Sequence, residues 1–255
     1  MVLTVDIGNT NIAIGAFRAN ALSFMARIST VTTSTEDEYA IKLADIVTVY
    51  GIDRGEIDGA IVSSVVPQLN TVMKRAISLA FSVEALLVGP GIKTGLVIRC
   101  DNPSSVGADI ISASVAAHAL YGAPTLIVDM GTATKITVLD GKGAFVGLSI
   151  MTGVRMGITA LANGTAQLPQ VSLDAPPTVI GKNTVDCMRS GAIFGNAAMI
   201  DGMIERIKEE CGTDFTLVAT GGLASAVIPH CTHSLHIDEH LVLKGLNLIY
   251  HKNQK

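Results

Sequence analysis

A short motif occurs twice in this chain, about half a chain length apart. Val5–Asn11 (VDIGNTN) is similar to Val128–Thr134 (VDMGTAT). In each copy an aspartate, a glycine and small polar residues separate two apolar runs, a pattern typical of a β-hairpin turn. The repeat therefore predicts a duplicated architecture in which each half carries one polar hairpin turn.

The order of predicted elements supports this duplication. The first half reads as strands at 2–6, 12–17, 23–30, 59–65 and 85–88, with helices at 35–50 and 67–81. Thr35 and Glu38 have the spacing of a capping box at the first helix. The second half reads as helices at 106–121, 153–163 and 183–211, with strands at 125–129, 135–140, 144–151 and 216–219. We expect two α/β halves, 1–105 and 106–255, each with a central mixed sheet flanked by helices, and a cleft between them.

Composition excludes several classes of protein. Hydrophobic residues make up 49% and charged residues 16% of the 255, enough for a large core. The formal net charge is −4 and no basic run occurs, which argues against nucleic-acid binding. The uncharged stretch 110–128 is interrupted by Gly122-Ala123-Pro124, so we expect no membrane span. With no signal peptide and four cysteines far apart, we expect a cytoplasmic protein with reduced thiols.

The first turn has the chemistry of a phosphate site. Gly8 lets the backbone approach a ligand closely, and Asn9, Thr10 and Asn11 offer hydrogen-bond donors for phosphate oxygens. Asp6 is expected to hold Mg²⁺, directly or through water, because hard cations prefer oxygen ligands. An ordinary polar hairpin turn is the competing interpretation, and the second copy weakens it.

The second half supplies two further candidate contacts. Thr132 corresponds to Asn9 and is expected to donate to a phosphate, while Asp129 has the chemistry to bind a cation or to cap the turn. Thr220-Gly221-Gly222 follows an apolar run and precedes a helical one, so it would let a nucleoside lie close to the backbone. A simple strand-to-helix turn explains the same pattern.

Asp109 is the candidate for acid–base chemistry. It follows Gly107-Ala108 at the start of a predicted helix, where a carboxylate interacts favourably with the helix dipole. The same position suits a general base that accepts the proton of an attacking hydroxyl. Position alone leaves both interpretations open.

Two apparent motifs are rejected. Gly181-Lys182-Asn183-Thr184 resembles the end of a P-loop, but the first glycine of that motif is missing. The four histidines between 230 and 240, with Cys231, lack the helix-spaced ligands of a zinc site, and solvated loop histidines are the preferred interpretation.

Taken together, these residues give the chain a resemblance to the type III pantothenate kinases, members of the actin-like and sugar-kinase ATPase superfamily. The combination that carries the resemblance is the following set of motifs: Asp6–Asn11, Gly89–Leu96, Asp101–Pro103, Val106–Asp109, Asp129–Thr134, Leu168-Pro169, Ile180–Thr184, Ala219–Ala224 and Leu243–Tyr250.

The resemblance implies a fold of two duplicated ribonuclease H-like domains and an activity, the ATP-dependent phosphorylation of pantothenate to 4′-phosphopantothenate, the first step of coenzyme A synthesis. It also implies Mg²⁺, a monovalent cation (K⁺ or NH₄⁺) and a homodimer. Asp109 would be the base and Asp129 would bind the monovalent cation. Gly107, Ala108 and Thr184 would line the pantothenate site, and Thr132 would contact ATP, next to the Gly221-Gly222 turn already expected to accommodate the nucleoside. The first phosphate turn would comprise Asp6, Ile7, Gly8, Asn9, Thr10, Asn11, Ile12 and Ala13.

Departures from the family pattern lie on the acceptor side. Many relatives have arginine where this chain has Ile110, and tyrosine where it has Cys100. Both positions belong to the predicted substrate site. They leave two alternatives to a pantothenate kinase: a catalytically degenerate nucleotide-binding regulatory protein, or a kinase for another small hydroxylated acceptor.

Overall fold

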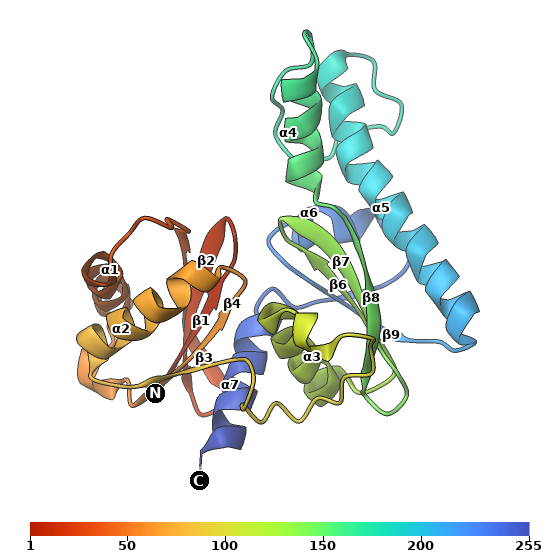
Figure 1. Cartoon of the computed structure of the whole chain (residues 1–255). Coiled ribbons are helices and arrows are strands. Elements are labelled where there is room, and N and C mark those ends of the chain that lie inside the picture. Colours follow the sequence, from red (N-terminus) through yellow and green to blue (C-terminus); the bar gives the residue numbers. More distant parts are fainter. Residues whose placement is uncertain (255) are drawn as a thin grey trace. The chain divides into compact units, whose positions relative to one another are not determined.

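The computed structural model describes residues 1–254, which form two compact units, each built around a five-stranded sheet (Figure 1). The first sheet has the order β3-β2-β1-β4-β5 and the second has the order β10-β9-β6-β7-β8. The strands of the first sheet are β1 (Val2–Ile7), β2 (Asn11–Arg18), β3 (Ala21–Ser29), β4 (Gly59–Ser64) and β5 (Ala85–Leu87). Those of the second are β6 (Thr125–Met130), β7 (Ala133–Leu139), β8 (Phe145–Thr152), β9 (Thr216–Thr220) and β10 (His236–Ile237).

The two sheets have the same connectivity. The central strand β1 pairs antiparallel with β2 and parallel with β4. Its counterpart β6 pairs antiparallel with β7 and parallel with β9. The predicted α/β architecture with two mixed sheets is therefore confirmed.

The first unit buries one face of its sheet against two helices, α1 (Glu36–Val49) and α2 (Asn70–Phe81). Val5 of β1 belongs to this core, together with Leu43 and Ile77 of the two helices. The predicted capping box starts α1, because Glu38 N–H donates to Thr35 Oγ1 and Thr35 N–H donates to Glu38 Oε2. This local sequence signal therefore sets the helix start as expected.

The opposite face of the first sheet carries α7 (Leu241–Asn253), which packs on β1, β2 and β4. A Cβ added to Gly15 would meet Leu243 Cδ1 at 3.0 Å and Thr4 Oγ1 at 3.2 Å, so Leu243 and Thr4 share this face. The predicted elements ended before this helix, and α7 and β10 are additions that the structure makes.

The second unit buries its sheet against α4 (Val154–Gly164), α5 (Thr184–Cys211) and α6 (Ala224–Val227). Figure 1 shows α4 and the first part of α5 extending side by side beyond the sheet. Val128 and Met130 of β6 belong to this core. Val128 therefore has the same place in the second unit as Val5 has in the first.

The compact units differ in content from the sequence halves 1–105 and 106–255. Residues 101–116 and 241–254 join the first unit, and residues 97–100 join the second. One reason is that α7 packs on the first sheet. Another is that Gly245 of α7 contacts α3 (Ala108–Tyr121), so closely that a Cβ on Gly245 would lie 1.8 Å from Ser112 O. The division at 105 stays a prediction about the sequence repeat.

The stretch 110–128 that raised the question of a membrane span contains the end of α3 at Tyr121 and the start of β6 at Thr125. Across residues 1–254, no helix combines the length and apolar character needed to cross a membrane.

Candidate functional site

Asp6 and Asp129 occupy equivalent places near the ends of the two central strands. Both strands show the same burial sequence, with a partly exposed aspartate between buried apolar residues. Because side chains alternate along a strand, burial of Val5 and Ile7 in the core directs Asp6 to the other face. Val128 and Met130 direct Asp129 in the same way. The repeat seen in the sequence is therefore a repeat of side-chain geometry.

The neighbours of Asp6 are small. In the sheet register Asp6 lies opposite Ala13 on β2 and opposite Ser63 on β4. The Ser63 hydroxyl donates a hydrogen bond to Asp6 Oδ1. This carboxylate and hydroxyl are hard oxygen donors, so the two residues fit a hydrated Mg²⁺.

The first turn presents its polar residues outward. Gly8 N–H donates to Asn11 O at 3.0 Å, and Thr30 Oγ1 on the next segment donates to Gly8 O at 2.7 Å. Asn9, Thr10 and Asn11 are exposed. Two members of the predicted set, Ile7 and Ile12, are fully buried, so only their backbone atoms can face a ligand.

The neighbours of Asp129 are different. In the register Asp129 lies opposite Thr220 on β9 and opposite Lys135 on β7. Lys135 Nζ lies 2.7 Å from Asp129 Oδ2, and the two side chains are only 15% and 20% exposed. The carboxylate predicted to bind a monovalent cation is thus in contact with a cationic side chain of the same unit.

The strand-end glycines approach the second turn closely. Gly221 has φ +93°, and a Cβ on it would lie 2.6 Å from the carbonyl carbon of Met130. A Cβ on Gly153, which precedes α4, would lie 2.0 Å from Thr132 O. Within the second unit the structure therefore brings Asp129, Thr132 and Gly221 into one cluster around the end of β6. Gly222 follows directly in the same turn.

Asp109 lies in the first turn of α3, in the same compact unit as Asp6. Its carboxylate lies against Gly107, where a Cβ would come within 2.5 Å of Asp109 Oδ1. Ala108 O accepts a hydrogen bond from Ser112 Oγ, and Ile111 N–H donates to Gly107 O, so the first turn is well formed. Ile110 is partly exposed beside it.

Cys100 and Thr184 belong to the second unit. Cys100 ends a segment that runs beside β8, where Ile98 bridges Phe145 and Arg99 N–H donates to Phe145 O at 2.8 Å. Thr184 is the first residue of α5, whose cap is Asn183. Their predicted role in substrate binding stays a prediction.

Sequence reasoning did not find Ser63 and Lys135, two of the register partners of the aspartates, and it noted Thr220 only as part of the Thr220-Gly221-Gly222 motif. Ser63 is a small residue in an apolar strand and carries little signal. Lys135 does carry one, because it is the only charged residue in the strand 133–139.

The histidine segment of residues 230–240 is more structured than predicted. His233 Nδ1 lies 2.8 Å from Asp201 Oδ1 and its Nε2 lies 2.5 Å from Glu205 Oε1, so His233 is not a solvated loop histidine. Burial raises the pKa of the nearby Cys231 thiol to about 12, aided by the charge of Asp201. Among residues 1–254 no group of three or more His, Cys, Asp or Glu side chains has the arrangement of a metal site.

The contact of His233 with Asp201 and Glu205 predicts that the stability of the fold depends on pH. Hydrogen bonding to Asp201, and also to Glu205, raises the pKa of His233 above its usual value. The stabilisation is therefore complete below about pH 6.5, the usual pKa of histidine, and is lost as the pH rises through the raised pKa. We expect the melting temperature of the wild type to exceed that of His233→Gln by about 2–4 °C near pH 6.

The gap between the two melting temperatures should narrow as the pH rises to about 9. A gap that stays constant over this range would show that the charge of His233 does not stabilise the fold.

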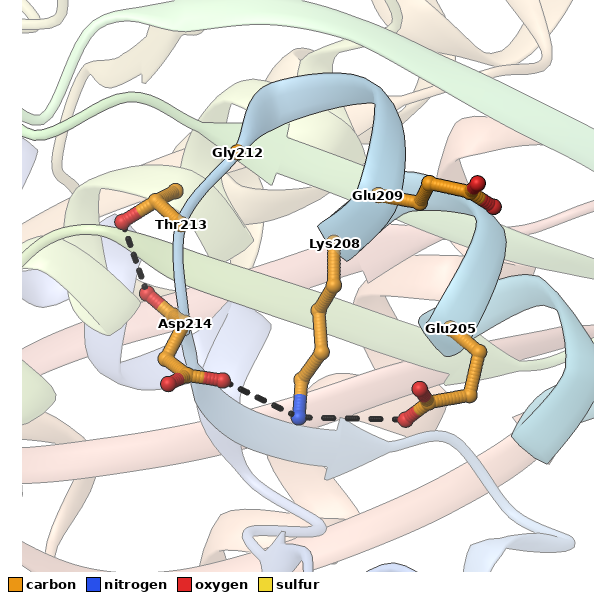
Figure 2. A pocket seen from close by; sticks show the side chains of 6 residues that line it. All are labelled: Glu205, Lys208, Glu209, Gly212, Thr213 and Asp214. Carbon is orange, nitrogen blue, oxygen red and sulfur yellow. Dashed lines mark hydrogen bonds and ion pairs between the residues drawn. The ribbon is translucent and has the colours of Figure 1, made fainter.

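Two other polar features lie away from the strand ends. Figure 2 shows a pocket at the end of α5, where Lys208 lies between Glu205 and Asp214. It adjoins the start of β9, the opposite end from Thr220, and its three carboxylates (Glu205, Glu209 and Asp214) against one lysine disfavour a phosphate.

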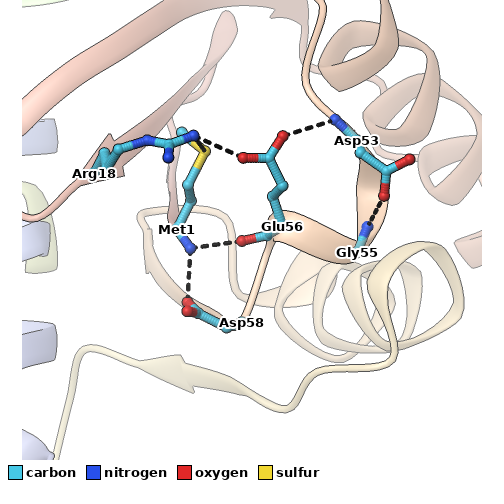
Figure 3. A network of polar contacts seen from close by, with 6 residues as sticks. All are labelled: Met1, Arg18, Asp53, Gly55, Glu56 and Asp58. Atoms are coloured by element: carbon cyan, nitrogen blue, oxygen red, sulfur yellow. Dashed lines mark hydrogen bonds and ion pairs between the residues drawn. The ribbon is translucent and has the colours of Figure 1, made fainter.

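The second feature anchors the start of β1. The Met1 amine donates to Glu56 O at 2.5 Å and to Asp58 Oδ1 at 2.9 Å, and an Arg18 nitrogen lies 2.6 Å from Glu56 Oε2 (Figure 3). Asp6 is at the other end of the same strand. The network thus holds the start of β1 in place, and its exposed ion pairs contribute little to the free energy of unfolding.

Comparison with known proteins places these residues in context. A family model described as type III pantothenate kinase matches residues 2–206. A type III pantothenate kinase from Exiguobacterium sp. is 42% identical over 255 residues, covering 100% of both chains. One from Moorella thermoacetica is 40% identical over 253 residues, covering 99% of this chain and 100% of the relative.

Among solved structures, the activator of the 2-hydroxyisocaproyl-CoA dehydratase from Clostridium difficile, with bound ADPNP, is similar with a TM-score of 0.57. The match covers 98% of this chain and 93% of the activator at 13% identity, so it bears on the fold alone. With the two equivalent sheets, it confirms the duplicated actin-like ATPase fold.

Proposed function

Because the chain belongs to the type III pantothenate kinases, we propose that it phosphorylates pantothenate with ATP and that Asp109 is the general base. The observation that carries the family is identity of about 40% over the whole chain. The reaction gives 4′-phosphopantothenate and ADP and belongs to coenzyme A synthesis.

The first unit supports the phosphate-binding part of this proposal. Asn9, Thr10 and Asn11 are exposed on a turn whose ends are fixed by buried strands, so their donors need little reorganisation to bind phosphate oxygens. Asp6 and Ser63 offer oxygen ligands for Mg²⁺. When bound with ATP, Mg²⁺ supplies positive charge to the phosphates.

Asp109 is proposed to accept the hydroxyl proton of pantothenate as the γ-phosphoryl group transfers. It can do so because a carboxylate oxygen is a hydrogen-bond acceptor that can take a proton from a hydroxyl held within hydrogen-bond reach. Gly107 leaves room for the carboxylate, and Ala108, Ile110, Cys100 and Thr184 are the proposed pantothenate contacts. Most of the rate gain would come from positioning and charge stabilisation.

The second unit is proposed to contact the nucleotide through Thr132 and the Gly221-Gly222 turn. Both lie around the end of β6, and the glycines leave the backbone accessible to a flat nucleoside. We also retain as proposals the homodimer and the cytoplasmic location. The monovalent cation that the resemblance implies at Asp129 is not part of the proposal, because Lys135 already contacts that carboxylate.

A second candidate function is a kinase for another small hydroxylated acceptor. Ile110 and Cys100 favour it, because they depart from the arginine and tyrosine that the resemblance implies on the acceptor side. A degenerate regulatory protein of the same fold is the third possibility.

Release of ADP, measured in a coupled assay with ATP, Mg²⁺ and KCl, separates these functions. Pantothenate-dependent release is expected, with the product identified as a phosphomonoester by mass spectrometry. Release with another alcohol but not with pantothenate would favour the second candidate. No release with any acceptor, while ATP still binds in calorimetry, would favour the regulatory protein.

A further inference from the structure

The two hairpin turns differ in length by one residue, and this changes the partner of each aspartate. In the first hairpin Ile7 pairs with Ile12 across the turn 8–11, which places Ala13 opposite Asp6. In the second, Met130 pairs with Thr134 across the shorter turn 131–133, which places Lys135 opposite Asp129. The shorter turn therefore moves a charged residue into the position that a methyl group has in the first copy.

The register makes the contact between Lys135 and Asp129 a local one. Residues directly opposite in an antiparallel pair have their side chains on the same face of the sheet. Lys135 Nζ lies 2.7 Å from Asp129 Oδ2 in surroundings that leave both side chains mostly buried. Solvent screening of the pair is weak there, so the charge of the ammonium group acts strongly on the carboxylate.

A monovalent cation at this carboxylate does not fit with Lys135 in place. A lysine ammonium group has three donors and no lone pair, so it cannot be a ligand of the ion. Two positive charges against one carboxylate oxygen would also repel each other. The side chain instead supplies what such an ion would supply, a single positive charge beside Asp129, and tethering gives it a high effective concentration.

We propose that Lys135 provides the positive charge at Asp129 from within the protein, so that the reaction does not depend on a monovalent cation. Lys135 is then a positioning residue that holds Asp129 and the Thr132 turn in the form that binds nucleotide. The activity measurements that test this inference rest on the proposed kinase function. Melting temperatures, measured without substrates, test it independently of that function.

The wild type provides the first test. ADP release is measured in a Tris–choline buffer free of K⁺ and NH₄⁺, and again with KCl or NH₄Cl replacing choline chloride at constant ionic strength. We expect the rate to change by less than about twofold, since only residual ionic effects remain. A rate that rises about tenfold or more with K⁺ or NH₄⁺ would overturn the proposal.

Variants provide the second test. Lys135→Met removes the charge and keeps an unbranched chain, so we expect the rate without K⁺ to fall by about tenfold or more and to recover with K⁺ or NH₄⁺. Lys135→Arg should remain independent of added cations. Lys142→Met, in the exposed turn between β7 and β8, is the matched control and should behave as the wild type. A Lys135→Met variant as active as the wild type without K⁺ would overturn the proposal, because a merely structural ion pair predicts that result.

A melting experiment without substrates gives the independent readout. KCl, compared with choline chloride, should leave the melting temperature of the wild type unchanged and raise that of Lys135→Met by about 2–4 °C. A rise specific to K⁺ in the wild type would overturn the inference even if pantothenate proved not to be the acceptor. Absence of ADP release with any acceptor would count against the kinase function, and the melting temperatures would still decide the role of Lys135.

Discussion

Replacing Asp109 with asparagine is expected to abolish turnover while ATP binding persists. Asparagine has the size and shape of aspartate but cannot accept the hydroxyl proton, so we expect kcat to fall by about a thousandfold. The affinity for ATP should change little, because the proposed phosphate contacts come from the two hairpin turns. Coupled ADP release measures the first quantity and titration calorimetry with a non-hydrolysable ATP analogue measures the second.

The competing role of Asp109, a carboxylate that interacts with the helix dipole, has a matched control. Asp37 is an exposed aspartate in the first turn of α1. Asp37→Asn should lower the free energy of unfolding by about 0.3–1 kcal/mol through the helix dipole and leave kcat unchanged. If Asp109→Asn gave the same small loss of stability with full activity, Asp109 would be a helix-terminal residue and not the base.

Gly107→Ala separates the position of the Asp109 carboxylate from its charge. The added Cβ would lie 2.5 Å from Asp109 Oδ1, and the carboxylate, as the end of a rotatable side chain, would move aside. Small displacements of a catalytic group are costly, so kcat should fall by about tenfold or more with the charge retained. Gly141→Ala, where no atom lies within 4 Å of the added Cβ, should leave kcat unchanged.

Replacing Gly221 with alanine is expected to destabilise the second unit strongly. At φ +93° an alanine is strained, and its Cβ would lie 2.6–2.7 Å from backbone atoms of Met130 that cannot rotate away. Strain and overpacking together should lower the free energy of unfolding by about 3 kcal/mol. The turn would also have to move from the end of β6, so ATP affinity should fall together with stability.

Gly212 is the matched control for this prediction. It also has a positive φ, +62°, at the end of α5, but no atom lies within 4 Å of the added Cβ. Gly212→Ala should therefore cost only about 1 kcal/mol, the cost of the left-handed conformation alone. The midpoints of urea unfolding measure both effects. Equal midpoints for the two variants would mean that the close approach of Gly221 to β6 contributes nothing to stability.

The sequence predicted the elements that depend on local interactions. The apolar runs predicted the strands, and the capping box of Thr35 and Glu38 predicted the start of α1 to within one residue. The duplicated motif predicted two equivalent turns, and the structure shows equivalent sheets around them. The family, and with it the kinase function, was also within reach of the sequence, because the motifs occur along nearly the whole chain.

The missed elements depend on long-range packing. The helix α7 lies at the end of the chain, but it packs on the face of the first sheet to which the Thr4 side chain points. The short strand β10 pairs with β9 through only two residues, which leaves no periodic pattern in the sequence. The prediction of a solvated His233 is wrong, because its partners Asp201 and Glu205 come from a helix about thirty residues earlier in the chain.

What the sequence by itself determined is that an aspartate and a glycine stand at two equivalent turns and that Asp109 begins a helix. What only the tertiary structure decided is which residues face those aspartates. A difference of one residue in turn length shifts the pairing of a whole strand, since side chains alternate between the two faces of a sheet. That shift places Ala13 opposite Asp6 and Lys135 opposite Asp129, so two similar motifs acquire different electrostatic surroundings.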